Sequence, residues 1–323
     1  MGDVRDVVIL GAGCAGWTAA IYTARAGLEP LLLTGHELGG QLAMTTEVEN
    51  YPGFPEGVLG PELMERMEQQ ARRFGTEVKI ERVSSVDFAG RPLRVTTPKA
   101  EYLAKAVIIA TGSTPRRLDI PGETELWGHG VSACATCDGA FYRGKTVVVV
   151  GGGDSAAEEA TFLTRFATKV YLVHRRDRLR ASAAMAQRVA DNPKIECVWH
   201  SAVSACLGDA QTGLRAVALR DVQTGAESEL ATDGFFLAIG HQPTTQFLGD
   251  AVALDGKGYV VTDHYQRTNV EGVFAAGDVQ DHVWQQAITA AGTGCAAALA
   301  CEKYLEALSG EVYPDERRTG IIA

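Results

Sequence analysis

The sequence predicts an α/β fold made of two Rossmann-like domains, the second inserted into the first. A run of apolar residues comes directly before a glycine cluster twice, in VVILGAGCAG near the N-terminus and in VVVVGGGDSA in the middle of the chain. This pattern is typical of a buried parallel strand that turns sharply into a helix. Two further runs, VIIATGSTP and FFLAIGHQP, echo one another in the same order, and we interpret them as the strands that close the two domains.

Chain length and the order of these runs predict the domain boundaries. At about 150 residues per domain, a chain of 323 residues suggests two domains. The segment from VVVVGGGDSA to FFLAIGHQP lies wholly inside the chain, and the residues after it carry no such strand-to-helix glycine cluster. We therefore expect residues 1–114 and 245–323 to form one discontinuous domain and residues 115–244 to form the inserted domain.

Two helices and a strand are predicted outside the glycine clusters. Pro61–Phe74 begins with proline, has apolar residues near helical spacing and is followed by Gly75, which is typical of an amphipathic helix. Val273–Asp278 is interpreted as a strand that returns to the first domain, and Trp284–Leu308 as the helix that follows it. Because this last run is rich in alanine and interrupted by glutamine and glycine, it predicts a buried helix and not a membrane span.

Composition limits the partners. With 46% hydrophobic and 22% charged residues and a net charge of −10, nothing attracts the chain to nucleic acid or to an anionic membrane, and neither partner is expected. The start MGDVRDVVIL lacks the pattern of a secretory signal, so we expect a cytoplasmic protein. Seven mostly scattered cysteines do not form a disulfide framework.

The first glycine cluster predicts a site for the pyrophosphate of a dinucleotide. Gly11, Gly13 and Gly16 permit a tight turn, close approach of the backbone to the phosphates and close packing of helix on strand. The acid expected about 20 residues later is absent from the end of the second strand, and Glu37 is the nearest substitute. The alternative is a glycine turn without a ligand, which the repeat downstream disfavours.

The second glycine cluster is followed by the basic run HRRDRLRA, at the register where an NADH site needs an acid. Cations at this place can pair bidentately with a 2′-phosphate, so the predicted cofactor is NADPH rather than NADH. The alternative is a solvated basic strand end. The residues that we assign to this site are Gly151, Gly153, Asp154, Ser155, Ala156, His174, Arg175, Arg176 and Arg180.

A hydride donor in the second domain requires an acceptor in the first. FAD is the natural acceptor that also contains an ADP group. Asp278, at the end of the returning strand, is expected to hold a hydroxyl group of the FAD polyol chain. A structural cap on the following turn is the alternative role for Asp278.

Cys134 and Cys137 form a CxxC motif. At this spacing they lie on one face of a helical turn within reach of a disulfide, as in the redox dithiols of cytosolic proteins. Half of a zinc site is the alternative, but no second CxxC or histidine pair completes four ligands, so we expect no metal. Asp138 follows directly, as a general acid to the thiolate or, alternatively, as a turn residue.

The predicted order of reaction is hydride transfer from NADPH to FAD and then electron transfer to the disulfide. The NADPH site and the disulfide belong to the same predicted domain and compete for one face of the flavin. Two rigid domains joined by short linkers near Gly112–Pro115 and Gly240–Thr244 could take turns at the flavin by rotating.

Ten segments in order closely resemble the low-molecular-weight, bacterial-type thioredoxin reductases, which are flavoprotein homodimers that use NADPH to reduce thioredoxin. The segments are GAGCAG, TGHELGGQL, TEVENYPGF, ATGSTPR, GVSACATCDG, GGGDSAAEEA, HRRDRLRA, AIGHQP, VFAAGDVQDH and QQAITAAGTGC. The resemblance implies the FAD- and NAD(P)-binding pyridine nucleotide-disulfide oxidoreductase architecture and a thioredoxin-disulfide reductase that acts by thiol–disulfide exchange. It implies that Cys137 faces the flavin, with Cys134 as its partner and Asp138 as general acid. The further FAD-site residues that it implies are Gly40, Gln41, Asn50, Gln286 and Ala287.

Four positions depart from the usual pattern of this family. Cys14 replaces a proline in the first glycine cluster, and Gln285 replaces an arginine near the flavin. His129 and Ala140 replace an arginine and a phenylalanine that are associated with gripping thioredoxin. We therefore hypothesise a partner with a less bulky recognition pocket, so that Ala140→Phe should change the Michaelis constants for cognate and foreign thioredoxins.

Three other functions share part of this pattern. A flavin dithiol oxidase would keep FAD and the CxxC motif without NADPH, which the second glycine cluster and the basic run disfavour. A ferredoxin or flavodoxin reductase of the same architecture would lack the CxxC motif. A nucleotide-sensing regulator with a structural cysteine pair would need an effector domain, for which this chain has no room.

Overall fold

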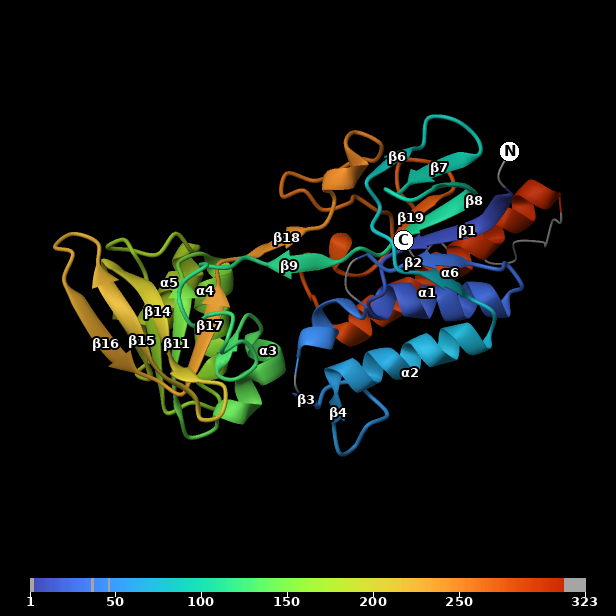
Figure 1. Cartoon of the computed structure of the whole chain (residues 1–323). Coiled ribbons are helices and arrows are strands. Elements are labelled where there is room, and N and C mark those ends of the chain that lie inside the picture. The colour runs from blue at the N-terminus through green and yellow to red at the C-terminus, as the bar shows by residue number, and fades with distance from the viewer. Residues whose placement is uncertain (1–2, 36–37, 46, 311–323) are drawn as a thin grey trace, which may run out of the picture. The chain divides into compact units, whose positions relative to one another are not determined.

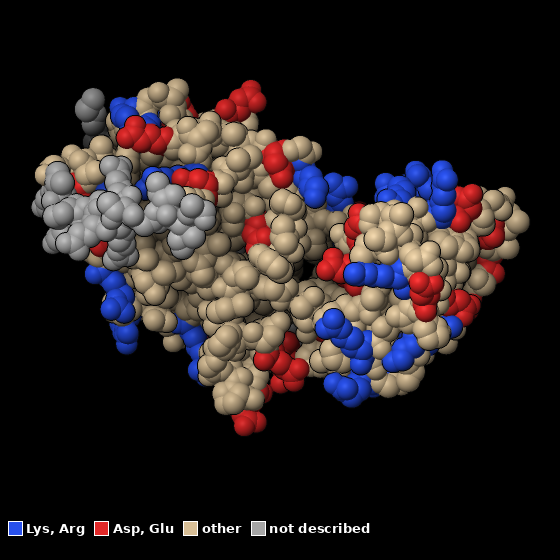
Figure 2. All heavy atoms as spheres, turned by 180° about the vertical axis from the view of Figure 1, so that it is seen from behind, with Lys and Arg blue, Asp and Glu red and all other residues tan. Residues whose placement is uncertain are grey.

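The computed structural model describes residues 3–35, 38–45 and 47–310, which divide into two units (Figure 1). The first unit takes in the described residues of Met1–Glu47, Tyr51–Ser113 and Pro243–Ala323. The second unit takes in Val48–Asn50 and Thr114–Gln242. On the face seen in Figure 2, acidic and basic side chains are interspersed, as expected for a chain with charges of both signs.

Two short strands carry the chain between the units. Strand β9 (Ser113–Pro115) leaves the first unit and strand β18 (His241–Pro243) returns to it, and the two strands pair with one another. Backbone N–H groups extend this pairing at both ends, from Thr244 to the Gly112 carbonyl oxygen (3.0 Å) and from Arg116 to that of Gly240 (2.9 Å). The two segments that we expected to act as linkers therefore pair with one another into a two-stranded ribbon.

A seven-stranded sheet organises the first unit. Its strands are, in spatial order, β5 (Glu77–Lys79), β2 (Leu31–Leu33), β1 (Val4–Leu10), β8 (Glu101–Ile109), β7 (Leu93–Thr96) and β6 (Ser85–Asp87), with β19 (Val273–Ala275) also paired to β8. Strands β5, β2, β1, β8 and β19 run parallel, and β7 is antiparallel to both β8 and β6. The C-terminal segment thus completes the sheet that the N-terminal segment begins.

Helices α1 (Cys14–Arg25) and α6 (Ala287–Ser309) pack tightly against one another in this unit. A Cβ atom on Gly294 of α6 would lie 2.3 Å from the carbonyl oxygen of Ala15, so only glycine permits this approach. The remaining short elements are the strands β3 (Glu47–Val48) and β4 (Val58–Leu59) and the 3-10 turns η1 (Gly40–Met44), η3 (Gln246–Leu248) and η4 (Gly277–Val279).

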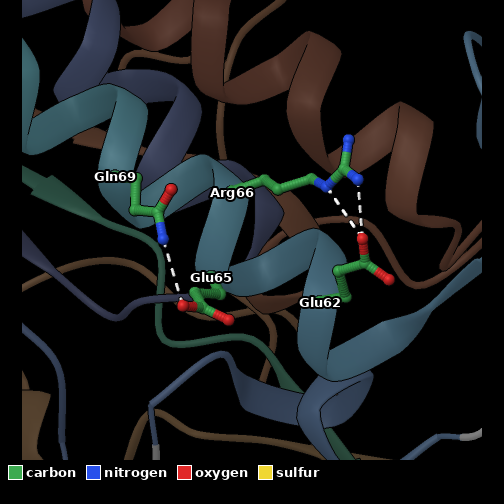
Figure 3. Close-up of polar contacts among 4 residues, drawn as sticks. All are labelled: Glu62, Glu65, Arg66 and Gln69. Atoms are coloured by element: carbon green, nitrogen blue, oxygen red, sulfur yellow. Dashed lines mark hydrogen bonds and ion pairs between the residues drawn. The ribbon is translucent and has the colours of Figure 1, made fainter.

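Helix α2 (Gly60–Arg73) matches the helix predicted over residues 61–74 to within one residue at each end. Its apolar side is buried, and its outer side carries polar pairs four residues apart (Figure 3). The Arg66 guanidinium donates two hydrogen bonds to Glu62 Oε1, at 3.0 and 2.6 Å, and Gln69 donates one to Glu65 at 3.0 Å. Spacing of four residues places both members of each pair on the same side of the helix.

Helix α6 begins at Ala287, later than the predicted Trp284. Gln285 has a φ of +47°, which is incompatible with a right-handed helix, and Gln286 then caps the helix through a capping box with Thr289. Within residues 3–35, 38–45 and 47–310, no helix is long and apolar enough to cross a membrane.

The second unit has a five-stranded parallel sheet between two layers. Its strands are, in spatial order, β10 (Val131–Ser132), β17 (Gly234–Ala238), β11 (Thr146–Gly151), β12 (Lys169–Val173) and β13 (Ile195–Val198). Helices α4 (Asp154–Leu163) and α5 (Ala183–Ala190) pack on one face. The other face packs against an antiparallel sheet of β14 (Ser201–Asp209), β15 (Gly213–Asp221) and β16 (Glu227–Ala231). The short helix α3 (Ala135–Asp138) and the turn η2 (Gly139–Tyr142) follow β10.

Candidate functional site

The first glycine cluster forms the tight turn between β1 and α1. A Cβ on Gly11 would lie 2.2 Å from the Ala110 carbonyl oxygen, and one on Gly16 would lie 1.9 Å from that of Gly11. Gly13, which precedes α1, faces open space, and no side chain caps this helix. The N–H groups at the start of α1 therefore remain available to a phosphate group, and the turn fits the pyrophosphate of a dinucleotide.

Two other predicted FAD-site residues lie beside this turn. A Cβ on Gly40, the first residue of η1, would lie 3.7 Å from the Cα of Gly13, and Gln41 follows it half-buried. Asn50 is exposed and groups with the second unit. Glu37 lies outside the described residues.

Asp278 lies in η4, directly after β19. Burial, together with the nearby charge of Asp281, raises the pKa of Asp278 to about 7. Burial and the charge of Asp278 raise the pKa of Cys14, the first residue of α1, to about 12, so Asp278 lies near the same helix end as the glycine turn. Among the described residues nothing donates a hydrogen bond to the Asp278 carboxylate. Such a buried acceptor fits a hydroxyl ligand better than a structural cap, which would accept a backbone N–H.

Glutamine side chains hold the segment that leads into α6. The Gln286 amide donates to the carbonyl oxygen of Gln285 at 3.0 Å, directly before Ala287 begins the helix. The Gln285 amide donates to the Ser113 hydroxyl at 3.2 Å and to the Tyr259 hydroxyl at 3.3 Å. Gln285 therefore ties the start of α6 to the first residue of β9.

The second glycine cluster repeats the geometry of the first. A Cβ on Gly151 would lie 2.4 Å from the Ala238 carbonyl oxygen, while Gly153, before α4, faces open space. No side chain caps α4, so its first N–H groups are also available to a phosphate. Ser155 is exposed in the first turn of this helix, and Ala156 is fully buried against the sheet.

The basic loop after β12 is held over this second turn. The backbone N–H of Arg180 donates to the Gly152 carbonyl oxygen at 2.6 Å. The Asp154 carboxylate accepts the N–H of Ser182 at 2.8 Å, and this bond lowers the pKa of Asp154. Asp154 thus positions the loop, in addition to lying at the predicted cofactor turn.

His174 differs from the arginines with which it was grouped. Its ring is buried against the glycine turn, where a Cβ on Gly152 would lie 2.2 Å from His174 Cε1. Burial, with smaller contributions from the arginine charges, lowers the pKa of His174, so its ring is neutral at pH 7. Arg175, Arg176 and Arg180 are exposed and supply the positive charge of this loop.

Cys134 and Cys137 form a disulfide at the start of α3, with Cα atoms 5.3 Å apart. Cys137 is exposed and Cys134 is half-buried. The Cys137 N–H donates to Cys134 Sγ at 3.2 Å. In the described part of the chain, no group of three or more histidine, cysteine or acidic residues could hold a metal ion.

Asp138 places a carboxyl group at the end of the same short helix. Burial raises the pKa of Asp138, and a hydrogen bond from Ser132 opposes only part of this effect. The acid therefore holds its proton to a higher pH than an exposed aspartate, as general acid catalysis requires. Gly139 continues in a helical conformation, with φ of −56° and ψ of −31°, so the pair does not form the turn considered as its alternative.

Two residues near the disulfide were not predicted from the sequence as site residues. The Ser132 hydroxyl accepts the Cys134 N–H at 3.0 Å and also bonds Asp138. The Glu159 carboxyl, on α4, accepts the backbone N–H of Ala135. Helical spacing was an available signal for Glu159, because it falls three residues after Ala156 and four before Leu163 on the buried side of α4.

Comparison with known proteins identifies the family. The model of the pyridine nucleotide-disulphide oxidoreductase family matches residues 5–294. The thioredoxin reductase of Streptomyces coelicolor is 52% identical over 99% of this chain and 100% of its own length. That of Mycolicibacterium smegmatis is 52% identical over 94% of this chain and 97% of its own.

Solved structures agree with these sequence matches. The thioredoxin reductase from Giardia duodenalis has a TM-score of 0.90 at 45% identity and covers 94% of this chain and 99% of its own. That from Streptococcus pyogenes has a TM-score of 0.91 at 40% identity over the same shares of the two chains. The resemblance that the ten segments indicate is thereby confirmed. With its paired glycine turns and its disulfide, the chain belongs to the pyridine nucleotide-disulphide oxidoreductase family and, within it, to the thioredoxin reductases.

Proposed function

We propose that this chain is an NADPH-dependent thioredoxin-disulfide reductase that contains FAD. The observation that carries the proposal is the Cys134–Cys137 disulfide, which lies in the same unit as the second glycine turn and its exposed arginines. A disulfide in the same unit as a dinucleotide-binding turn is typical of an enzyme that passes electrons from a nicotinamide to a thiol. Relatives at about half identity are named thioredoxin reductases, which supports thioredoxin as the substrate.

Residues of each unit would hold one cofactor. In the first unit, the N–H groups of α1 bind the pyrophosphate of FAD and Asp278 accepts a hydroxyl group. In the second unit, Arg175, Arg176 and Arg180 pair with the 2′-phosphate of NADPH. Bound FAD would accept the hydride of NADPH and supply two electrons to the disulfide.

The electrons, protons and sulfur–sulfur bonds of the proposed reaction balance between this chain and thioredoxin. Two electrons and two protons convert the Cys134–Cys137 disulfide into two thiols, and Asp138 donates one proton to a departing thiolate. One thiolate then attacks the disulfide of oxidised thioredoxin, which forms a mixed disulfide and releases one thioredoxin thiolate. The second cysteine attacks the mixed disulfide, releases reduced thioredoxin and restores the Cys134–Cys137 bond.

We further propose that the second unit presents its NADPH and its disulfide to the flavin in turn by rotating about the ribbon β9–β18. The ribbon supports this role because it is a single short connection that two strands share. A hinge made of a few residues at element ends is a common device for such motion.

Assembly, location and partner choice complete the proposal. From the resemblance we propose a homodimer, for which light scattering coupled to size exclusion is the test. Five of the seven cysteines form no disulfide, which supports a reducing compartment such as the cytoplasm. Ala140 is exposed directly after the CxxC helix, which supports the hypothesis that this position contacts thioredoxin.

One anaerobic experiment tests the function. Purified protein reconstituted with FAD is mixed with NADPH or NADH, flavin bleaching is followed, and thioredoxin is then added with a chromogenic disulfide. We expect NADPH to bleach the flavin faster than NADH and thioredoxin to be reduced catalytically. Cys134→Ser should keep the bleaching and lose the turnover. Flavin bleaching without reduction of thioredoxin in the unaltered protein would refute the proposal.

A further inference from the structure

Glu159 lies on a helix next to the one that carries the redox disulfide, and it has no part in the chemistry described above. It belongs to α4, which packs against α3, and its carboxyl accepts the N–H of Ala135. Ala135 is only 1% exposed, so water cannot replace this acceptor. The Cys137 N–H already donates to Cys134 Sγ. The Cys134 N–H donates to the Ser132 hydroxyl, so the N–H groups of the CxxC turn have a hydroxyl, a carboxyl group and a sulfur atom as acceptors.

The Glu159 carboxyl is buried without a compensating cation. Its Oε2 atom is buried and has no hydrogen-bond partner in the described ranges of the chain. The charge that acts on it is the like charge of Glu158. Strands β11 and β17, which also pack on α4, carry no titratable residue. The titratable groups of the other packed elements are Cys134, Cys137 and Asp138 at α3, Tyr142 on η2, Arg188 on α5, and Lys169 and Tyr171 on β12.

Neither cation among these groups pairs with Glu159. Lys169 pairs with Glu196 at 2.7 Å, and the Arg188 guanidinium contacts the sulfur of Met185. Burial therefore raises the pKa of Glu159 to about 8, with the Ala135 N–H opposing this effect and Glu158 adding to it. The carboxyl is neutral at pH 7 and becomes charged as the pH rises through about 8.

The Ala135 N–H belongs to the peptide bond that joins Ala135 to Cys134, so the Glu159 carboxyl binds the residue directly after the half-buried Cys134. Reduction of the disulfide creates negative charge on one of the two sulfurs before the second proton arrives. A like charge at about 4–6 Å disfavours an ionised group and raises the pKa of a thiol. A neutral Glu159 avoids this penalty, whereas an ionised Glu159 imposes it.

We propose that Glu159 is a positioning residue for the redox dithiol: its carboxyl fixes the first turn of α3 through the Ala135 N–H and, while it keeps its proton, leaves Cys134 free to carry negative charge. The inference deepens the proposed function, since it concerns the same disulfide. It predicts that the ionisation of Glu159 above pH 8 raises the pKa of the Cys134 thiol and so lowers the fraction of Cys134 that is present as thiolate in the reduced enzyme.

The test measures thiol reactivity and uses neither NADPH nor thioredoxin, so its failure is distinguishable from failure of the proposed function. The flavin-loaded enzyme is reduced with dithiothreitol and freed of it, and iodoacetamide labelling of Cys134 is followed from pH 6 to pH 10 by tandem mass spectrometry of its peptide. Glu159→Gln keeps an oxygen acceptor for the Ala135 N–H and cannot ionise. We expect it to label about three- to tenfold faster than the unaltered enzyme at pH 9 and equally fast at pH 6.5.

A matched control removes one acidic charge elsewhere in the same unit. Glu227 is exposed on β16, and Glu227→Gln should label like the unaltered enzyme at every pH. Identical profiles for Glu159→Gln and the unaltered enzyme would overturn the proposal, as would an equal acceleration by Glu227→Gln.

A second measurement needs no variant, in case Glu159→Gln does not fold. Infrared difference spectra of the unaltered enzyme follow the protonated carboxyl band that titrates near pH 8, in the oxidised and in the reduced state. Because coupling between two ionisable groups is reciprocal, the thiolate of the reduced enzyme should move this titration to higher pH. The same midpoint in both states would contradict the proposal.

Discussion

The contact between α1 and α6 makes a sharp prediction about two glycines on one helix. A Cβ on Gly294 would lie 2.3 Å from the Ala15 carbonyl oxygen and 2.9 Å from its Cα. A Cβ on Gly292 would meet nothing within 4 Å, and this residue is exposed. Gly294→Ala and Gly292→Ala therefore add the same methyl group two residues apart, in contact with a backbone in one case and with solvent in the other.

The magnitude follows from these distances. The Gly294 methyl group falls more than about 1 Å short of the ~3.5 Å that carbon contacts prefer, and a backbone carbonyl cannot swing aside. Overpacking of this kind typically costs about 1–3 kcal/mol, against a gain of about 1 kcal/mol for alanine over glycine in a helix. Because a fixed backbone oxygen lies only 2.3 Å away, we place the cost of Gly294→Ala at the upper end, about 3 kcal/mol, which leaves a net loss of about 2 kcal/mol after the helix gain. Gly292→Ala should gain up to about 1 kcal/mol.

Thermal unfolding followed by circular dichroism is the assay, with flavin content measured on the same samples. At about 2–4 °C per kcal/mol for a domain of this size, Gly294→Ala should melt about 4–8 °C below the unaltered protein and Gly292→Ala slightly above it. Since Ala15 lies in the first turn of α1, beside the glycine cluster, Gly294→Ala should also retain less flavin. Equal melting temperatures for the two variants would refute the close approach of these helices.

Three further predictions concern charged residues. Arg175→Ala combined with Arg176→Ala should raise KM for NADPH at least about tenfold and leave KM for NADH unchanged in steady-state kinetics, because charged hydrogen bonds contribute roughly 1.5–3 kcal/mol; an equal rise for both would remove these arginines from the 2′-phosphate site. Asp138→Asn should slow disulfide reduction about 10²- to 10⁴-fold in stopped-flow traces. Burial raises the pKa of Asp138, so the rate of the unaltered enzyme should fall as the acid ionises, and a variant as fast as the parent would exclude the general acid role. Burial raises the pKa of Asp278 to about 7, so the folded apoprotein holds this proton to a higher pH than the unfolded chain does and should lose stability as pH rises from about 4 to 7. The melting temperature of the Asp278→Asn apoprotein should equal that of the parent apoprotein at pH 4 and exceed it at pH 8. Equal melting temperatures at pH 8 would contradict the burial of this carboxylate.

Residues whose role is local could be predicted from the sequence. The turn at Gly11 needs a residue without a side chain, so an apolar strand followed by glycine at this spacing is sufficient to predict it. The CxxC spacing likewise places two sulfurs on one helical turn, and the structure joins Cys134 to Cys137. The later start of α6 was not predictable, because the left-handed conformation of Gln285 depends on its bonds to Ser113 and Tyr259.

The sequence by itself determined the paired glycine turns, the disulfide and the return of the C-terminal segment to the first sheet, because each depends on backbone geometry within a few residues or on the order of strands along the chain. Only the tertiary structure decided that His174 is a buried neutral ring and that the Glu159 carboxyl packs against the helix that carries the disulfide. The physical reason is that a side chain loses its water, and its pKa shifts, only when segments distant in sequence pack around it.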